Sequence, residues 1–139
     1  MQFVPYLTFD GGCAEAFRFY VRLLGGRLET LQTHGESPIA ADVPPDYRDL
    51  VLHARLVVGD QVLMGSDAPP EHRARAQGFH VAIQVDSAPE AERLWAGLSE
   101  KGSITMPLQQ TFWEDRFGMC TDRYGTPWMV NCPQPVPVG

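Results

Sequence analysis

Hydrophobic and polar residues follow the same order twice along this chain. Residues 3–26 show an alternating strand pattern, an aspartate, a short polar turn, an amphipathic helix and a glycine stop, and residues 78–102 repeat that order. When Phe3 is aligned with Phe79, the aspartates that follow the two strands coincide. A unit repeated at a spacing of roughly 75 residues indicates two copies of one module that share a core. We therefore expect a binding site between the copies.

In the first copy, apolar residues at intervals of three and four predict a helix from Cys13 to Leu24, which two glycines end. Alternation predicts a strand over Phe3–Phe9, and Pro5, which has no N–H to donate, places it at a sheet edge or at the seam between the halves. Residues 34–49 lack periodicity and contain three prolines, which predicts a long loop of the kind that forms lids or binding loops. The other strands expected in this copy span residues 27–33, 50–58 and 61–66.

The second copy predicts the same elements. They are a strand at 79–85, a helix at 88–100, a strand from 104 to 106 or beyond, and a hairpin from 116 to 132. The summed pattern predicts an α+β fold of two tandem βαβββ modules that form a curved mixed sheet with the helices on its outer face. By alternation, the side chains expected on the inner face are Val4, Tyr6 and Thr8 in the first copy and His80, Ala82 and Gln84 in the second.

The chain has 139 residues and is 44% hydrophobic, which suits one core of ordinary size. We therefore expect a single domain over residues 1–139. Its predicted parts are a first module (1–67), a linker (68–77), a second module (78–133) and a proline-rich tail (134–139).

Charge and composition exclude several function classes. The net charge is −6 and the chain has one lysine, Lys101, so no basic surface is available for nucleic acid. The N-terminus shows no secretory signal and no segment reaches membrane-spanning length, so we expect a cytoplasmic protein without a membrane partner. Three cysteines fit no metal or redox spacing and are expected to be reduced.

Three segments carry a family resemblance: FDGGCAEAFRFYVRLLGG, HARLVVGDQVLMGSD and LQQTFWEDRFGMCTDRYGTPWMVN. They resemble the PhnB-like branch of the vicinal-oxygen-chelate superfamily, which includes glyoxalase I, bleomycin-resistance proteins and extradiol dioxygenases. The similarity runs from Met1 to about Cys132. Members of this branch also carry a demethylubiquinone-methyltransferase label. We do not carry that activity over, because the sequence has neither the glycine-rich loop nor the length of a doubly wound methyltransferase fold.

The resemblance implies a divalent cation held by side chains from the first and last strands of each module. At the corresponding positions the second module has His80 and Met129, whereas the first has Val4 and either Met64 or Gly65. One histidine leaves too few hard ligands for a catalytic cation. We therefore expect no metal site and no other cofactor.

The inner face and the loop before the last hairpin supply candidates for binding a ligand. Aromatic and thioether side chains favour a flat apolar ligand, and an arginine can pair with a carboxylate or phosphonate. The ordinary alternatives are a packed core for the apolar side chains and solvated surface for the arginines. The candidate ligand-binding residues are Tyr6, His53, Arg55, His80, Gln84, Trp113, Arg116 and Met129.

These residues predict a PhnB-like protein of the glyoxalase/bleomycin-resistance type that binds a small organic molecule in a concave sheet cavity without a catalytic metal. Two alternatives stay open. His80 and His53, helped by Glu114 or Asp115, would support a metal-dependent lyase, isomerase or dioxygenase. Exposed strand edges would instead support a dimeric interaction module, and we expect a homodimer in either case. Whether the protein is an enzyme is left open.

Overall fold

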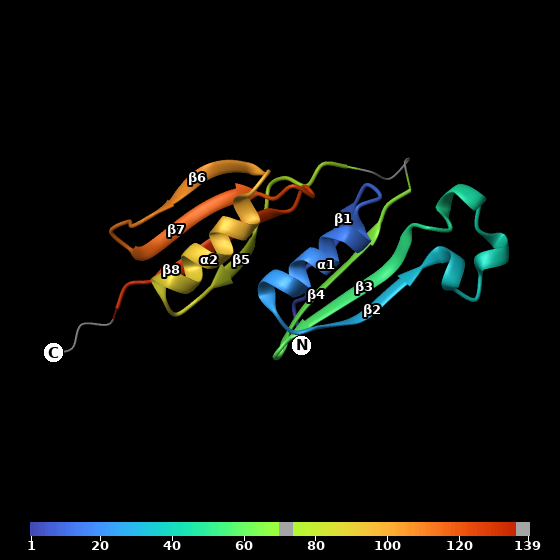
Figure 1. Cartoon of the computed structure of the whole chain (residues 1–139), viewed down its shortest axis with the longest axis horizontal. Coiled ribbons are helices and arrows are strands. Elements are labelled where there is room, and N and C mark those ends of the chain that lie inside the picture. The colour runs from blue at the N-terminus through green and yellow to red at the C-terminus, as the bar shows by residue number, and fades with distance from the viewer. Residues whose placement is uncertain (70–73, 136–139) are drawn as a thin grey trace. The chain divides into compact units, whose positions relative to one another are not determined.

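The computed structural model describes residues 1–69 and 74–135, and the chain divides into two compact units, Met1–Ala74 and Arg75–Gly139. We call them unit 1 and unit 2. In each unit, one α-helix lies against one four-stranded mixed sheet, with the elements in the order βαβββ (Figure 1). The predicted α+β class with tandem βαβββ modules is confirmed. Residues 70–73 of the predicted linker and 136–139 of the predicted tail lie outside the described residues.

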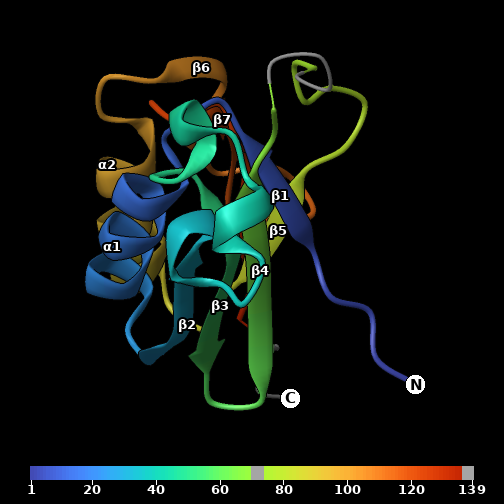
Figure 2. The ribbon, with the colours of Figure 1, turned by 90° about the vertical axis from the view of Figure 1, so that its right-hand side faces the viewer.

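Unit 1 places its first strand at a sheet edge. Its elements are β1 (Tyr6–Phe9), α1 (Cys13–Leu24), β2 (Arg27–Thr33), β3 (Val51–Val58) and β4 (Gln61–Asp67). The strand order is β1-β4-β3-β2, with β1 parallel to β4 and the other neighbours antiparallel. The strand order places β1 at an edge, as predicted from Pro5, but ladder pairing starts at Tyr6 and not at Phe3. Figure 2 shows α1 lying along one face of this sheet.

The segment between β2 and β3 contains short helical turns where the sequence predicts an irregular loop. They are η1 (His34–Glu36), η2 (Ala40–Asp42) and η3 (Pro45–Tyr47), all 3-10 helices. The Glu36 carboxylate accepts hydrogen bonds from the Thr33 amide at 3.2 Å and the Thr33 hydroxyl at 2.8 Å. Such turns rest on local contacts between residues three apart, so they need no apolar periodicity and the hydrophobic pattern does not predict them.

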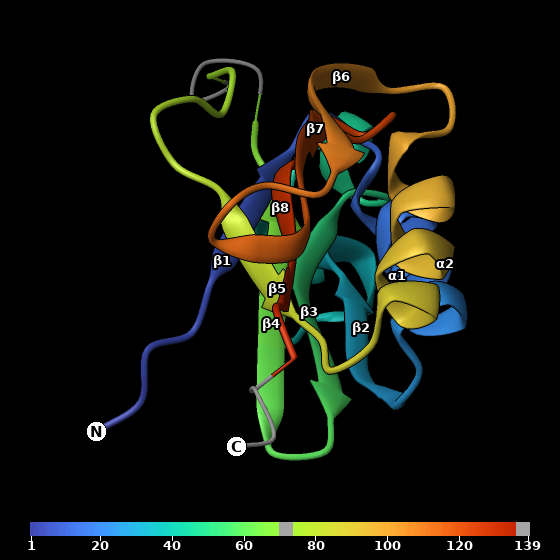
Figure 3. The same ribbon diagram turned by 90° about the vertical axis from the view of Figure 1, so that its left-hand side faces the viewer.

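Unit 2 has the same topology. Its elements are β5 (Val81–Gln84), α2 (Ala88–Ser99), β6 (Ser103–Gln109), β7 (Glu114–Thr121) and β8 (Pro127–Pro133). The strand order is β5-β8-β7-β6, with β5 parallel to β8. Figure 3 shows α2 on one face of this sheet. Within residues 1–69 and 74–135, no helix combines the length and the apolar character that a bilayer crossing requires.

The core of each unit lies between the helix and the sheet, and a glycine allows close contact in both. A Cβ atom added to Gly65 would lie 2.8 Å from the Phe17 ring of α1, and one added to Gly118 would lie 2.8 Å from the Trp95 ring of α2. The buried apolar side chains of unit 1 include Leu7, Phe9, Phe17, Tyr20, Ala54 and Leu56, and those of unit 2 include Ala91, Leu94, Leu98, Cys120, Trp128 and Val130.

Two buried carboxylates fix the chain around these cores. Asp67 accepts hydrogen bonds from the Cys13 amide at 3.0 Å and the Val51 amide at 2.9 Å, which ties α1 and β3 to the end of β4. Asp122 accepts from the Trp128 indole N–H at 2.7 Å and from the Thr126 amide at 3.1 Å, which closes the turn between β7 and β8. Hydrogen bonds to a charged acceptor are stronger than neutral ones, and these are shielded from water.

Candidate functional site

Each sheet has a second face, opposite its helix, which we call the helix-free face. In β1 of unit 1, Leu7 and Phe9 are buried on the helix side, whereas Tyr6 on the opposite, helix-free face is 50% exposed. In unit 2, Ala82 and Gln84 are exposed. The predicted alternation is therefore confirmed within β1 and β5, whereas Val4 and His80, which were assigned to the same faces, precede these strands.

The helix-free face of unit 1 is polar and its charges are paired. The Tyr6 hydroxyl lies 3.4 Å from His53 Nδ1, and the two rings stack with their centroids 5.9 Å apart. Arg55 Nε lies 3.2 Å from Glu29 Oε1. The structure thus brings Tyr6 and His53 together, while a neighbouring strand supplies a partner for the Arg55 charge.

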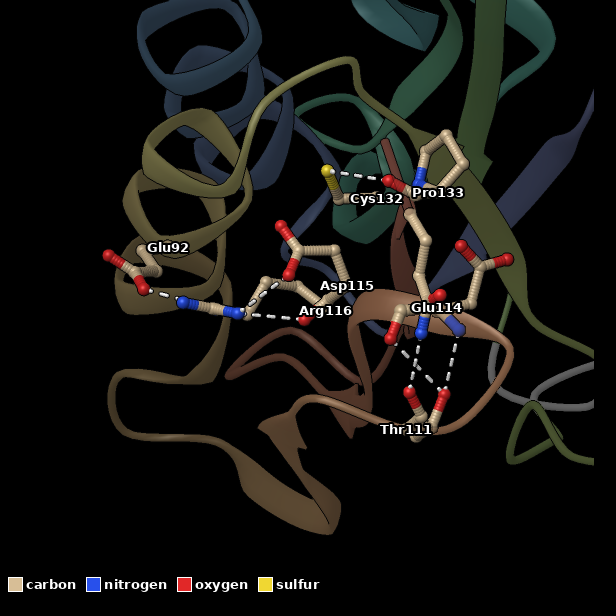
Figure 4. A network of polar contacts seen from close by, with 8 residues as sticks. Glu92, Thr111, Glu114, Asp115, Arg116, Cys132 and Pro133 are labelled. Carbon is tan, nitrogen blue, oxygen red and sulfur yellow. Dashed lines mark hydrogen bonds and ion pairs between the residues drawn. The ribbon is translucent and has the colours of Figure 1, made fainter. Parts of the chain in front are cut away.

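A β-bulge in β7 separates two neighbouring charged residues, Glu114 and Arg116. Glu114 is paired with Pro133 and Arg116 with Cys132, so two steps along β7 match one step along β8. Since a single extra residue reverses the face of the side chains that precede it, Glu114 lies on the helix-free face and Arg116 on the helix side. Figure 4 shows the Arg116 side chain directed toward α2 and the Glu114 carboxylate directed away from it.

Arg116 is held on the helix side by two acidic residues. Its Nε lies 3.2 Å from Glu92 Oε1 of α2, and its Nη1 donates to the Asp115 carbonyl at 2.7 Å (Figure 4). Nη1 also lies 3.2 Å from Asp115 Oδ1. Arg116 therefore does not join the other ligand-binding candidates on the helix-free face.

Aromatic rings gather at the start of β7. Trp113 is 50% exposed, and its ring centroid lies 5.8 Å from Phe117 and 4.7 Å from Phe112, both in edge-to-face contact. Phe117 is paired with Asn131 on β8, and Met119 with Met129. Phe117 is absent from the residues predicted by sequence. The alternation of Phe117 with Met119 could have indicated it.

Two hydrogen-bond acceptors on this face have no partner. Asn131 Oδ1 and Glu114 Oε2 are both buried, and no donor among the described residues reaches either atom. Gln84, a predicted candidate, is paired with Asn131 across β5 and β8. Asn131 was also missed by the sequence analysis, although it stands two residues after Met129 and therefore shares its face. A buried polar atom without a partner costs free energy and calls for an explanation.

The donors at the metal-binding positions that the resemblance implies do not fit a hard divalent cation. Met64 is paired with Tyr6 and Met129 with Ala82, so the two thioethers occupy matching places in the two sheets. Thioethers are soft ligands, whereas the hard cations prefer oxygen. His80 is exposed and precedes β5. Among the described residues, no group of three or more His, Cys, Asp and Glu side chains is placed to hold a metal ion.

The cysteines are buried and free, and they do not form a nucleophilic site. Burial raises the pKa of the Cys13 thiol to about 12, with the Asp67 carboxylate adding to the effect. Burial likewise raises the pKa of the Cys120 thiol to about 11, assisted by Asp122. At neutral pH both side chains stay protonated, and a thiol is a far weaker nucleophile than a thiolate.

Comparison with known proteins agrees with this architecture. The Escherichia coli (strain K12) protein YjdN is 34% identical over 139 residues, which cover 94% of this chain and 95% of YjdN. Protein PA1353 from Pseudomonas aeruginosa is 49% identical, with a TM-score of 0.89 over 97% of this chain and 99% of that chain. The fold is also similar to that of the Bacillus cereus PhnB protein, with a TM-score of 0.80 at 22% identity over 95% of this chain and 99% of that chain.

The family comparison settles the resemblance drawn from the sequence. The model of the glyoxalase/bleomycin resistance protein/dioxygenase superfamily matches residues 2–130. This range covers β1 to β7 and the first part of β8, and therefore includes elements of both βαβββ units. The chain therefore belongs to the glyoxalase/bleomycin resistance protein/dioxygenase superfamily.

Proposed function

We propose that this protein binds a small organic molecule with an aromatic or apolar body on the helix-free face of unit 2, and that binding needs no metal ion. The observation that carries the proposal is the half-exposed Trp113 ring beside Phe117, on the face that Met119 and Met129 share. Small-molecule sites are lined mainly by apolar and aromatic side chains with a few polar groups, and this face has that composition.

The aromatic group is positioned by the backbone as well as by ring contacts. Thr111 and Glu114, on either side of Phe112 and Trp113, form a closed turn. The Thr111 amide donates to the Glu114 carbonyl at 3.0 Å. The Glu114 amide donates to the Thr111 hydroxyl at 2.9 Å (Figure 4). A ring that is held in place while exposed loses little entropy when a ligand covers it. Phe112 is 90% exposed, so the same turn offers further apolar surface.

Binding of aromatic molecules to protein dialysed against a chelator tests the proposal. In amide NMR titrations we expect shifts at Trp113, Phe117 and Met129, and weaker binding in Trp113→Ala. Phe3→Ala is the matched control, because Phe3 is an aromatic residue that is 93% exposed in unit 1. The proposal fails if no aromatic molecule binds, or if binding appears only after metal is added.

The two alternative functions, a metal-dependent enzyme and a dimeric interaction module, can be tested directly. A metal-dependent activity would appear as stoichiometric metal in protein purified without chelator, and His80→Ala would lose that metal. The predicted homodimer is tested by sedimentation at micromolar concentration, where a monomer alone would contradict it. The apolar pairs on the helix-free face of unit 2, such as Met119 with Met129, favour metal-free binding over both alternatives.

A further inference from the structure

We infer that the ligand of the helix-free face of unit 2 carries a protonated amine joined to an aromatic ring, which makes it an arylalkylammonium ion. This inference rests on the proposed function and adds the charge and the hydrogen-bonding character of the ligand. Its basis is a pair of buried acceptor atoms, Glu114 Oε2 and Asn131 Oδ1, that lack donors within the described residues.

The register places both acceptors around one aromatic side chain. Glu114 is opposite Pro133, and the next helix-free pair along the same two strands is Phe117 with Asn131. Phe117 also contacts the half-exposed Trp113 ring. A molecule lying on these rings would therefore have acceptors beside it that no donor in residues 1–69 and 74–135 satisfies, so we expect the ligand to supply the N–H groups.

The charge of Glu114 makes a cation the suitable donor. Arg116 is the nearest cation in sequence, but the bulge turns it to the helix side, where Glu92 and Asp115 hold it. Among the described residues no cationic side chain is paired with Glu114. A carboxylate removed from water is stabilised strongly by a charged donor, and an ammonium group also binds favourably over the faces of aromatic rings.

The chemistry of the two acceptors narrows the ligand class further. An ammonium group has three N–H donors and no acceptor, so it can donate to more than one oxygen atom at once. A carboxylate or phosphonate ligand would place its charge beside Glu114 without any donor to offset the repulsion. A neutral alcohol has a single donor and cannot satisfy both atoms.

Three probes of similar shape test the inference: phenethylamine, 2-phenylethanol and 3-phenylpropanoate. At pH 7 we expect the amine to bind about tenfold or more tightly than the alcohol, which is the effect of one hydrogen bond between charged groups. The propanoate should bind most weakly. Added salt should lower the affinity for the amine and leave the affinity for the alcohol unchanged, because salt screens the attraction between the ammonium group and Glu114.

Variants separate the role of charge from that of the apolar face. Glu114→Gln keeps the shape of the side chain and should weaken amine binding about 10- to 100-fold while the alcohol is unaffected. Glu92→Gln is the matched control, since Glu92 lies on α2 and pairs with Arg116 on the other side of the sheet. We expect Glu92→Gln to change neither affinity. Circular dichroism checks that both variants are folded.

The outcomes distinguish this inference from the proposed function. If all three probes bind equally, or if Glu114→Gln leaves amine binding unchanged, the ammonium inference is wrong while an aromatic site remains. If neither these probes nor other aromatic molecules bind, the proposed function itself fails. A preference for the amine that Glu114→Gln removes and Glu92→Gln retains supports both.

Discussion

Replacing Asn131 by leucine should stabilise the free protein, although it removes a polar side chain from a β-strand. Asn131 Oδ1 is buried with no donor among the described residues, so the folded state bears the free-energy cost of an unpaired acceptor. That cost is about 1–3 kcal/mol, and leucine has nearly the same branched shape without a polar atom. Because the Asn131 residue as a whole is only half-buried, we expect a gain near the lower end, about 1 kcal/mol.

The matched control is a buried polar side chain in the same unit that is fully engaged. Asp122→Asn would turn an amide N–H₂ toward the Trp128 indole N–H, which now donates to Asp122 Oδ2 at 2.7 Å. Losing one charged hydrogen bond and leaving two donors face to face should cost about 3–5 kcal/mol. The two asparagine changes thus have opposite expected signs, although both concern hydrogen-bonding side chains near β8.

Urea denaturation followed by tryptophan fluorescence and circular dichroism measures both effects. Asn131→Leu should raise the midpoint without changing the slope, and should raise the melting temperature by about 3–5 °C for a chain of this size. The same variant should weaken binding of phenethylamine. A loss of more than about 1 kcal/mol in Asn131→Leu would refute the reasoning, because Asn131 would then hold the native fold and not be reserved for a ligand.

Three further predictions follow from other parts of the structure. Cys13 and Cys120 should resist thiol reagents in the native state, which thiol titration at pH 8 checks. Burial raises their pKa values to about 12 and about 11, so the folded state favours the neutral thiols. The stability that this preference contributes should be lost as the pH rises above the ordinary thiol pKa of 9.0, which melting at increasing pH checks. Gly118→Ala should destabilise unit 2 by about 1–3 kcal/mol, because its Cβ would lie 2.8 Å from the Trp95 ring, and urea midpoints measure the change. His80→Ala should leave aromatic binding by chelator-treated protein unchanged in titration calorimetry, whereas a large loss would favour the metal-dependent alternative.

Much of the fold follows from periodicity because the core of each unit has only two layers. A helix packed on one face of a sheet needs one apolar stripe, and the spacing of apolar residues predicted α1 with the bounds that the structure has, Cys13–Leu24. The strand β2, Arg27–Thr33, also matches its predicted span. Pro5 correctly indicated an edge strand, because a residue without an N–H cannot pair on both sides.

The arrangement of the candidate site was less predictable because it depends on one bulge. Strict alternation gives Glu114 and Arg116 the same face, and the extra residue between them reverses that relation. The acidic partner of Arg116, Glu92, is 24 positions away on α2, so no local pattern indicates the pair. Asn131 was missed for a different reason: an unpaired acceptor is defined by the absence of a donor in space, which a sequence does not show.

The register of the two sheets shows which positions of the two helix-free faces correspond, and the side chains at some of these positions differ in polarity. In unit 1, Gly65 of β4 pairs with Leu7 of β1 and with Ala54 of β3. In unit 2, Val130 of β8 pairs with Ile83 of β5 and with Gly118 of β7, so Ala54 and Gly118 occupy equivalent positions. His53 in unit 1 therefore matches Phe117 in unit 2.

By the same count Arg55 matches Met119, so unit 1 has a histidine and a paired arginine where unit 2 has a phenyl ring and a thioether. Desolvating an ion pair such as Arg55 with Glu29 under an apolar ligand is unfavourable, whereas covering Phe117 and Met119 is favourable. We therefore expect Tyr6→Ala in unit 1 to leave phenethylamine binding within about twofold of wild type, while Trp113→Ala weakens it by about tenfold or more, as the loss of one stacked aromatic contact implies. Equal losses in the two variants, measured by calorimetry, would mean that the site is not confined to unit 2.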